Sequence, residues 1–306
     1  MDRRVFLKVS GAALAGLALS DADALAAGWG RRDRALYGRR PKGHFTLKQL
    51  SSVTDTIGNS YLLRTAGGKV IMVDGGFDTE AEKLREHLVV AGNRVDLWFI
   101  SHPHNDHMGA LDAILRDRRG LSIGRIIHSR VPDAFLDLEQ GHCHYARLFY
   151  QALDNLPGET DVVDLHTTGG RFDIDGIGIM VLGVANPEFR TNPYNNQSLI
   201  LRFWDDNKSV VLLGDAGVEC GDKVLARYRE YLDCDYLQMA HHGQSGCSEP
   251  FYKAVSFRAC LWPTPSWVWE PAADGPLKTR DTRRWMDEKG IAEHHVSCLE
   301  KDWMLL

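Results

Sequence analysis

The sequence predicts a layered α/β fold in one domain. From Phe45 onward, short apolar runs alternate with longer amphipathic segments, as strands alternate with helices in such folds. Several apolar runs end directly in histidine or aspartate, which is typical of α/β proteins whose site lies where the strands end. No low-complexity linker follows residue 44, so we assign residues 45–306 to a single domain.

Residues 1–26 have the features of an export signal. A basic pair precedes a short apolar stretch, Val9–Leu19, and an A-x-A pattern follows at 24–26. The stretch RRVFLK at 3–8 resembles the twin-arginine signal, whose pattern is R-R-x-F-L-K. We therefore expect a periplasmic or secreted protein that loses residues 1–26, keeps a flexible mature N-terminus at 27–44 and has no stable membrane anchor. An uncleaved anchor is the alternative, although a spanning helix needs about 20 apolar residues.

The charge balance favours a small-molecule substrate. The formal net charge is -5, and it does not change when residues 1–26 are removed, because they contain three basic and three acidic residues. The absence of a basic run counts against nucleic acid as a partner, with nuclease action retained as an alternative. The 6 cysteines are widely spaced and form no C-x-x-C pair, so we expect buried free thiols, with disulfides as the alternative.

The predicted elements follow the apolar pattern along the chain. Strands are expected at 57–65, 69–74, 95–101, 125–129, 177–182, 198–204, 209–214 and 235–240. Helices are expected at 79–90, 109–116, 218–231 and 279–289. Residues 131–160 follow a strand and are expected to form an insertion with a helix. This helix would overhang the edge of the sheet at which the strands end. For its triplet His142, Cys143 and His144, a third metal site and simple exposure remain alternatives.

Four predicted strands deliver a polar side chain from their carboxyl ends. Asp74 follows KVIMV, His102 comes just after VDLWFI, Asp215 follows SVVLLG, and His241 follows DYLQMA. In layered α/β proteins, the loops at these ends converge on one edge of the sheet and bind ligands there. We therefore expect the four side chains to lie close together.

The stretch SHPHNDHMGAL contains the pattern H-x-H-x-D-H. His102 and His104 occupy alternate positions of an extended loop and can face one ion, while Asp106 and His107 lie around the turn and can face a second ion. Gly109 fits a tight start to the following helix. Imidazole nitrogens and carboxylate oxygens are the ligands that borderline divalent metals prefer.

This motif after a strand resembles the signature of the metallo-β-lactamase superfamily, and the resemblance extends from about Thr46 to the C-terminus. It implies a four-layer αββα sandwich with a dinuclear metal site, in which Asp74 supports the ligands, Asp215 bridges both ions and His241 is the last ligand. The segments NNQSLILRF, VVLLGDA and DYLQMAHHG are similar to the ComEC-type branch, which has N-x-S-L, L-x-G-D and H-H-G-S in that order. The ligands implied are His102, His104, Asp106, His107, Asp215 and His241.

One position departs from the usual family pattern. Many members have a further histidine for the first ion, but this chain has NNQS at that place. Asn196 is the candidate for a weak oxygen ligand or a substrate contact. With fewer imidazoles, Zn²⁺ remains the expected ion and Mn²⁺ becomes a plausible alternative.

The expected activity is hydrolysis of a phosphodiester or phosphoester by a hydroxide that bridges two divalent ions. Asp106 would orient this hydroxide, and His242 would donate a proton to the leaving group or bind the substrate oxyanion. Hydrolysis of a lactone, thioester or β-lactam is the alternative among enzymes. A binding protein that keeps the fold without turnover is the alternative of a different class.

Overall fold

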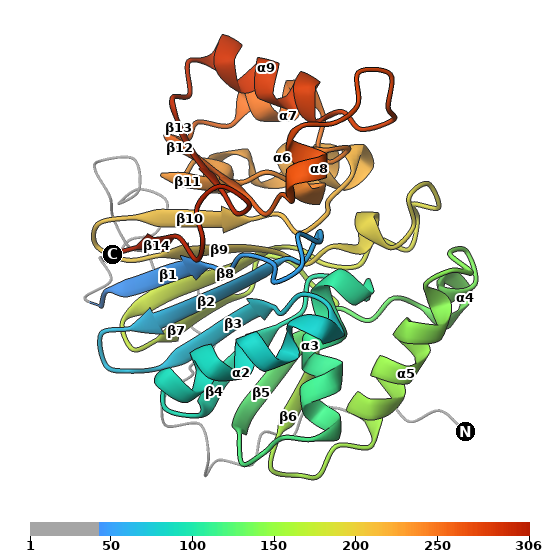
Figure 1. Cartoon of the computed structure of the whole chain (residues 1–306), viewed down its shortest axis with the longest axis vertical. Coiled ribbons are helices and arrows are strands. Elements are labelled where there is room, and N and C mark those ends of the chain that lie inside the picture. Colours follow the sequence, from blue (N-terminus) through green and yellow to red (C-terminus); the bar gives the residue numbers. More distant parts are fainter. Residues whose placement is uncertain (1–42) are drawn as a thin grey trace.

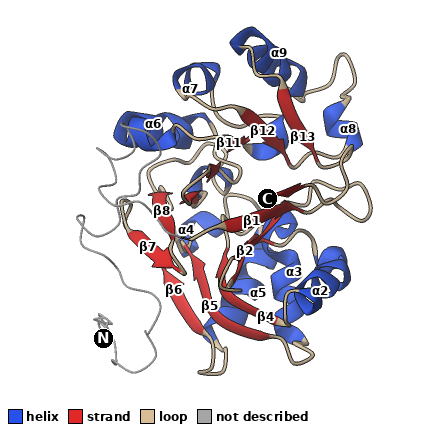
Figure 2. Cartoon of the chain, turned by 90° about the vertical axis from the view of Figure 1, so that its left-hand side faces the viewer, coloured by secondary structure: helices blue, strands red, loops and turns tan. Residues whose placement is uncertain are grey.

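The structure, a computed structural model, describes residues 43–306. The expected export signal at 1–26 therefore lies outside the described residues. Two 7-stranded sheets pack face to face, and helices cover both outer faces (Figures 1 and 2). This arrangement confirms the four-layer αββα fold expected from the sequence.

The first sheet is mixed and has the order β14-β1-β2-β3-β4-β5-β6. In this order, the strands from β14 to β3 pair antiparallel, and the strands from β3 to β6 pair parallel. The strands are β1 (Phe45–Gln49), β2 (Ser60–Thr65), β3 (Val70–Asp74), β4 (Arg94–Phe99), β5 (Ser122–His128), β6 (Asp161–Asp164) and β14 (Met304–Leu305).

The second sheet is also mixed and has the order β13-β12-β11-β10-β9-β8-β7. Its last four strands pair parallel, and the others pair antiparallel. The strands are β7 (Arg171–Ile174), β8 (Ile177–Gly183), β9 (Ile200–Trp204), β10 (Ser209–Leu212), β11 (Tyr236–Gln238), β12 (Ala259–Trp262) and β13 (Glu293–Val296).

The helices divide between the two outer faces (Figure 1). The first sheet is covered by α2 (Ala81–Val90), α3 (Asn105–Arg116) and α5 (Cys143–Asp154), and the second by α6 (Val218–Leu232), α7 (Glu249–Ala254) and α9 (Thr279–Lys289). The short helices are α4 (Asp133–Leu136), α8 (Ser266–Trp269), η1 (Asp78–Glu80), η2 (Asn195–Gln197) and η3 (His241–Gly243). Among the described residues, no helix combines the length and apolar composition that crossing a membrane requires.

Strand β3 shows why the central strands read as continuous apolar runs. Ile71 and Val73 point into the core between the two sheets. Val70 and Met72 point to the opposite face, into the core beneath α2 and α3. Strands that are buried on both faces need apolar residues at every position. The aspartate that ends this strand is therefore placed at the end of a fully buried strand.

Helix α3 begins earlier than the sequence predicts. We expected it to start at Gly109, but it starts at Asn105, so that Asp106 and His107 lie in its first turn. Gly109 lies inside the helix, where a Cβ atom would be 2.7 Å from the backbone nitrogen of Asp78. The glycine thus allows the close approach of α3 to η1. All 6 cysteines lie among the described residues and are free; Cys220, Cys247 and Cys260 are buried as expected, whereas Cys143, Cys234 and Cys298 are only partly buried.

Candidate metal centre

The polar residues at the strand ends meet between the two sheets. Asp74 ends β3, and the loop after β4 carries His102 and His104. From the second sheet, Asp215 follows β10, and His242 follows β11 in η3. The expected convergence at one edge is therefore present, and it uses strands of both sheets.

One group of side chains joins the start of α3 to the second sheet. It consists of Asp106, His107, Asp215 and His242, all buried, with ligand atoms within 4.8 Å of one another. His107 Nε2 lies 3.2 Å from Asp215 Oδ1 and 3.4 Å from Asp106 Oδ2. His242 Nε2 lies 3.1 Å from Asp106 Oδ2 and 3.2 Å from Asp215 Oδ2. Two carboxylates and two imidazoles thus surround one point.

A second group shares Asp215 with the first. It contains His102, His104 and Asp215, again with ligand atoms within 4.8 Å of one another. His102 Nε2 lies 2.9 Å from His104 Nδ1 and 3.9 Å from Asp215 Oδ2. Two neighbouring groups that share one carboxylate are the arrangement that two divalent ions require.

Unpartnered polar atoms show that these groups fit a metal. His107 Nε2 and Asp215 Oδ1 are buried and make no hydrogen bond, although they lie 3.2 Å apart. A buried polar atom without a partner is costly in a folded protein, so such atoms need an explanation. Nitrogen and oxygen atoms that converge without pairing form a ligand set that suits a divalent metal ion.

Asp74 fixes the orientation of the ligands as the sequence suggests. Its Oδ2 accepts hydrogen bonds from Asn59 Nδ2 at 2.9 Å and Ser101 Oγ at 2.8 Å, and it lies 2.8 Å from His107 Nδ1. A histidine that donates one ring N–H to a carboxylate presents its other nitrogen to a metal. Asp74 therefore leaves His107 Nε2 free for coordination.

The two consecutive histidines after β11 lie differently from our expectation. His242, which we expected to act as the proton donor, is buried in the first group, and its Nδ1 lies 2.9 Å from the carbonyl oxygen of Pro263. His241, the expected ligand, belongs to neither group of converging ligand atoms, and its side chain is 19% exposed. His242 is thus the better placed ligand, and His241 lies at the margin of the centre.

Asn196 does not face the centre, which corrects its expected role. Its Nδ2 donates to the carbonyl oxygen of Thr191 and to Glu219 Oε2, and its Oδ1 accepts from the backbone N–H of Cys220. The side chain therefore holds the start of α6 rather than an ion. Asn195 faces the centre instead, because its Nδ2 lies 3.3 Å from His241 Nε2.

The charged groups of the centre shift one another's pKa values. Burial would raise the pKa of Asp215 and of Asp106, but the rings of His107 and His242 together outweigh burial and keep both pKa values well below their usual range. Burial would lower the pKa of His242, but the carboxylates of Asp215 and Asp106 raise it to about 9. The same carboxylates raise the pKa of His107. Cations that displace these protons would find charged carboxylates in place.

Glu139, in the insertion, is a site residue that the sequence did not reveal. Its Oε2 lies 2.7 Å from His104 Nε2. His142 packs its ring against the ring of His104, with centroids 4.5 Å apart. In contrast, the thiol of Cys143 donates a hydrogen bond to the carbonyl oxygen of Gln140, and His144 is exposed. Of the triplet we singled out, only His142 reaches the centre.

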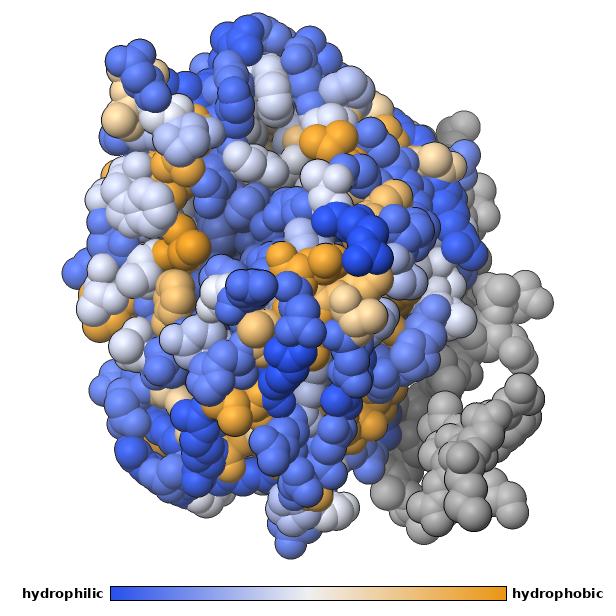
Figure 3. Space-filling model, turned by 90° about the vertical axis from the view of Figure 1, so that its right-hand side faces the viewer, coloured by the Kyte–Doolittle hydropathy of each residue, from blue (hydrophilic) through white to orange (hydrophobic). Residues whose placement is uncertain are grey.

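Figure 3 shows the side of the molecule that carries α4 and α5 in Figure 1, with small hydrophobic areas among hydrophilic ones.

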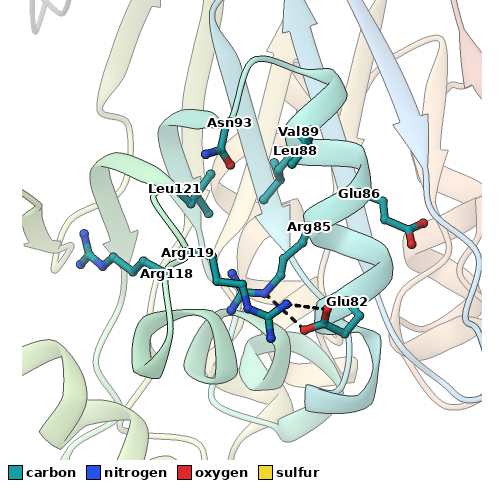
Figure 4. Close-up of a pocket in the computed structure, with 9 residues that line it drawn as sticks. All are labelled: Glu82, Arg85, Glu86, Leu88, Val89, Asn93, Arg118, Arg119 and Leu121. Atoms are coloured by element: carbon teal, nitrogen blue, oxygen red, sulfur yellow. Dashed lines mark hydrogen bonds and ion pairs between the residues drawn. The ribbon is translucent and has the colours of Figure 1, made fainter.

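A pocket of about 410 Å³ lies at the opposite end of the first sheet, beside α2 and the turn before β5 (Figure 4). Three arginines line it, but Glu82 pairs with Arg119 at 2.8 Å and with Arg85 at 3.5 Å. Arg118 donates to Thr160. The residues that line this pocket include no histidine or aspartate, unlike those of the centre at the strand ends.

The chain is similar to one family model and to several solved structures. A family model described as the metallo-beta-lactamase superfamily matches residues 53–246. The metallo-beta-lactamase fold protein YhfI from Bacillus subtilis is similar in structure, with a TM-score of 0.53 and 14% identity over 85% of this chain and 98% of that chain. A diphosphatase from the PhnP family has a TM-score of 0.48 and 14% identity, over 86% of this chain and 98% of that chain. CmlA, a diiron beta-hydroxylase from Streptomyces venezuelae, has a TM-score of 0.49 and 14% identity, over 89% of this chain and 56% of that chain. No curated protein matches the sequence.

Proposed function

The chain belongs to the metallo-beta-lactamase superfamily, whose members are mostly hydrolases, and from this we propose that it is a dinuclear hydrolase of phosphodiesters or phosphoesters. The observation that carries the proposal is the pair of histidine and aspartate groups that share Asp215. When bound, two divalent ions lower the pKa of water and polarise the substrate oxygen. Zn²⁺ is the expected ion, with Mn²⁺ as the alternative.

The ligand assignment follows the geometry of the two groups. His102, His104 and Asp215 would hold one ion, which leaves a position open for water. Asp106, His107, Asp215 and His242 would hold the other. Asp106 would also orient the attacking hydroxide, the role expected from the sequence.

His241 takes the substrate-contacting role in this proposal. Its side chain is 19% exposed, whereas that of His242 is 0% exposed. It also lies beside Asn195, so that the two polar side chains face the same margin of the centre. We assign to His241 the binding of the substrate oxyanion or of the leaving-group oxygen.

The phosphoester class is favoured by the chemistry and by the charge. A pair of metal ions suits in-line displacement at phosphorus, and the motif order L-x-G-D then H-H-G resembles the ComEC-type branch. The net charge of -5 counts against a long polyanion, so a small phosphoester is the better substrate.

We further propose export by the twin-arginine route. Mass spectrometry of the exported protein should find residue 27 at the N-terminus, and an intact residue 1 would contradict cleavage.

The test combines metal analysis with a substrate panel. Purified protein loaded with Zn²⁺ or Mn²⁺ is assayed with bis(p-nitrophenyl) phosphate, a lactone and a chromogenic β-lactam. We expect two ions per chain and turnover of the phosphodiester. Asp215→Ala should lose both ions and reduce turnover to background, because this residue belongs to both groups. Asp274→Ala, at an exposed position, serves as the control.

Each of the other outcomes has a defined meaning. Turnover of the lactone or the β-lactam alone would replace the substrate class and keep the hydrolase. Metal binding without any turnover would favour the non-catalytic binding protein. Full activity of Asp215→Ala would remove the dinuclear scheme altogether.

A further inference from the structure

We propose that Glu139, between α4 and α5, is a positioning residue for the metal ligand His104. The inference depends on the ligand assignment made above for the proposed function. Glu139 Oε2 lies 2.7 Å from His104 Nε2. Glu139 Oε1 accepts a hydrogen bond of 2.8 Å from the backbone N–H of Tyr194. Both carboxylate oxygens are therefore engaged, and the side chain is held from two sides.

The contact determines which nitrogen of His104 carries the proton. A carboxylate only accepts hydrogen bonds, so Nε2 must donate and Nδ1 keeps its lone pair. Nδ1 is the atom that lies 2.9 Å from His102 Nε2, within the group that includes Asp215. A ligand histidine bonded in this way has a fixed orientation and a more basic coordinating nitrogen. Glu139 thus selects the tautomer of His104 that can bind an ion.

The insertion that carries Glu139 is firmly attached to the rest of the domain. Tyr194 donates a hydrogen bond from its hydroxyl to the carbonyl oxygen of Leu136 at 2.8 Å. Leu136 and Tyr150 also belong to the core beneath α2 and α3. The insertion therefore supports His104 from a packed base.

The same residues do not form a separate metal site. His104, Glu139 and His142 have ligand atoms within 4.8 Å of one another. However, Glu139 Oε1 is already engaged by the backbone N–H of Tyr194, and His142 is an exposed residue that packs its ring against His104. The 2.7 Å between His104 and Glu139 is the length of a direct hydrogen bond. The contact is therefore an orienting one.

The sharpest variant is Glu139→Gln, because it keeps the volume and changes the hydrogen bonds. A carboxamide has one accepting oxygen and one donating nitrogen. If the oxygen accepts from Tyr194, the nitrogen faces His104 Nε2 and favours the tautomer whose proton blocks Nδ1. Glu139→Ala removes the contact altogether. Asp137→Asn is the matched control, since Asp137 lies in the same insertion and only pairs with Arg147 at 2.8 Å.

Metal affinity is measured by competition with a chelating dye, and the ligand field is measured from the visible absorption of the Co²⁺-loaded protein. Both Glu139 variants should bind one of the two ions about 10- to 100-fold more weakly. They should also show an altered Co²⁺ spectrum at unchanged melting temperature of the metal-free protein. Asp137→Asn should match the wild type in all three measurements. If Glu139→Ala does not fold, Glu139→Gln carries the test.

Two results would overturn the inference. One is wild-type affinity and an unchanged spectrum in Glu139→Gln. The other is an equal loss of both ions together with a lower melting temperature of the metal-free variant, which would indicate general support of the fold. Wild-type protein that binds two ions without hydrolysing any ester would contradict the proposed function and leave this inference intact.

Discussion

At the residue scale, backbone conformation decides which of two adjacent histidines enters the metal centre. His241 and His242 both have positive φ values, 53° and 55°. Consecutive left-handed residues reverse the chain sharply after β11 and turn the second side chain inward. The carbonyl oxygen of Pro263, 2.9 Å from His242 Nδ1, then directs Nε2 towards Asp106 and Asp215.

This geometry predicts different effects for the two histidines. His242→Ala should remove one of the two ions, because it deletes a buried ligand. His241→Ala should keep both ions and lower kcat/KM by about 10²- to 10⁴-fold, the range for a lost proton-transfer or oxyanion contact. Metal analysis by mass spectrometry and steady-state kinetics separate the two effects. Loss of an ion in His241→Ala with retention in His242→Ala would restore the assignment expected from the sequence.

The site residues differ in how far the sequence could reveal them. His102, His104, Asp106 and His107 share one short segment, so their spacing alone indicated a metal site, and the structure brings them together. Glu139 contacts His104 from 35 positions further along the chain, which no local pattern records. Asn196 matched the position of a missing ligand, but its hydrogen bonds to α6 turn it away from the centre.

At the element scale, the start of α3 places two ligands. Asp106 and His107 lie in its first turn, and the helix can start that early only because Gly109 packs closely against η1. The motif spacing indicated a tight start and misplaced it by four residues, because the contact with η1 is tertiary. Strand β13 was not predicted, for a similar reason. Glu293–Val296 reads EHHV and is too polar to be recognised as a strand without its partner β12.

Gly109→Ala should weaken both the fold and the metal site. The added Cβ would lie 2.5 Å from Asn105 Oδ1 and 2.7 Å from the backbone nitrogen of Asp78, so that α3 must shift. We expect a loss of about 1–3 kcal/mol in the free energy of unfolding, the usual cost of overpacking. Urea denaturation of the metal-free protein measures this loss, and dye competition measures the weaker metal binding.

Gly158→Ala is the control for this experiment. No heavy atom lies within 4 Å of its Cβ position, so the free energy of unfolding should change by less than about 0.5 kcal/mol. Equal stability of the two variants would show that α3 does not depend on close packing at Gly109.

At the scale of the whole molecule, the metal centre joins the two halves of the sandwich. Asp106 and His107 are supplied by the loop and helix after β4 in the first sheet, whereas Asp215 and His242 follow strands of the second sheet. Bound ions would therefore cross-link the sheets at the edge where the strands end. Any ligand that binds only the folded state also stabilises it by mass action.

Because bound metal would displace protons from the histidines of the centre, we predict that the stabilisation by metal grows as the pH rises from about 6.5 to 9. In the metal-free protein, the pKa of His242 is raised to about 9 by Asp215 and Asp106. A raised pKa means that the stabilising contribution of this proton is complete below the unfolded value of about 6.5 and is lost as pH rises through the folded value. The loss is on the order of 3 kcal/mol at most, and His107, whose pKa is also raised, acts in the same direction.

With metal bound, the cation replaces these protons, so the stability of the metal-loaded protein should hardly depend on pH over this range. Melting temperatures of chelator-treated and Zn²⁺-loaded protein at pH 6.5, 7.5 and 9 measure the gap between the two forms. A gap that stays constant or narrows would show that His242 is not the residue whose proton the metal displaces.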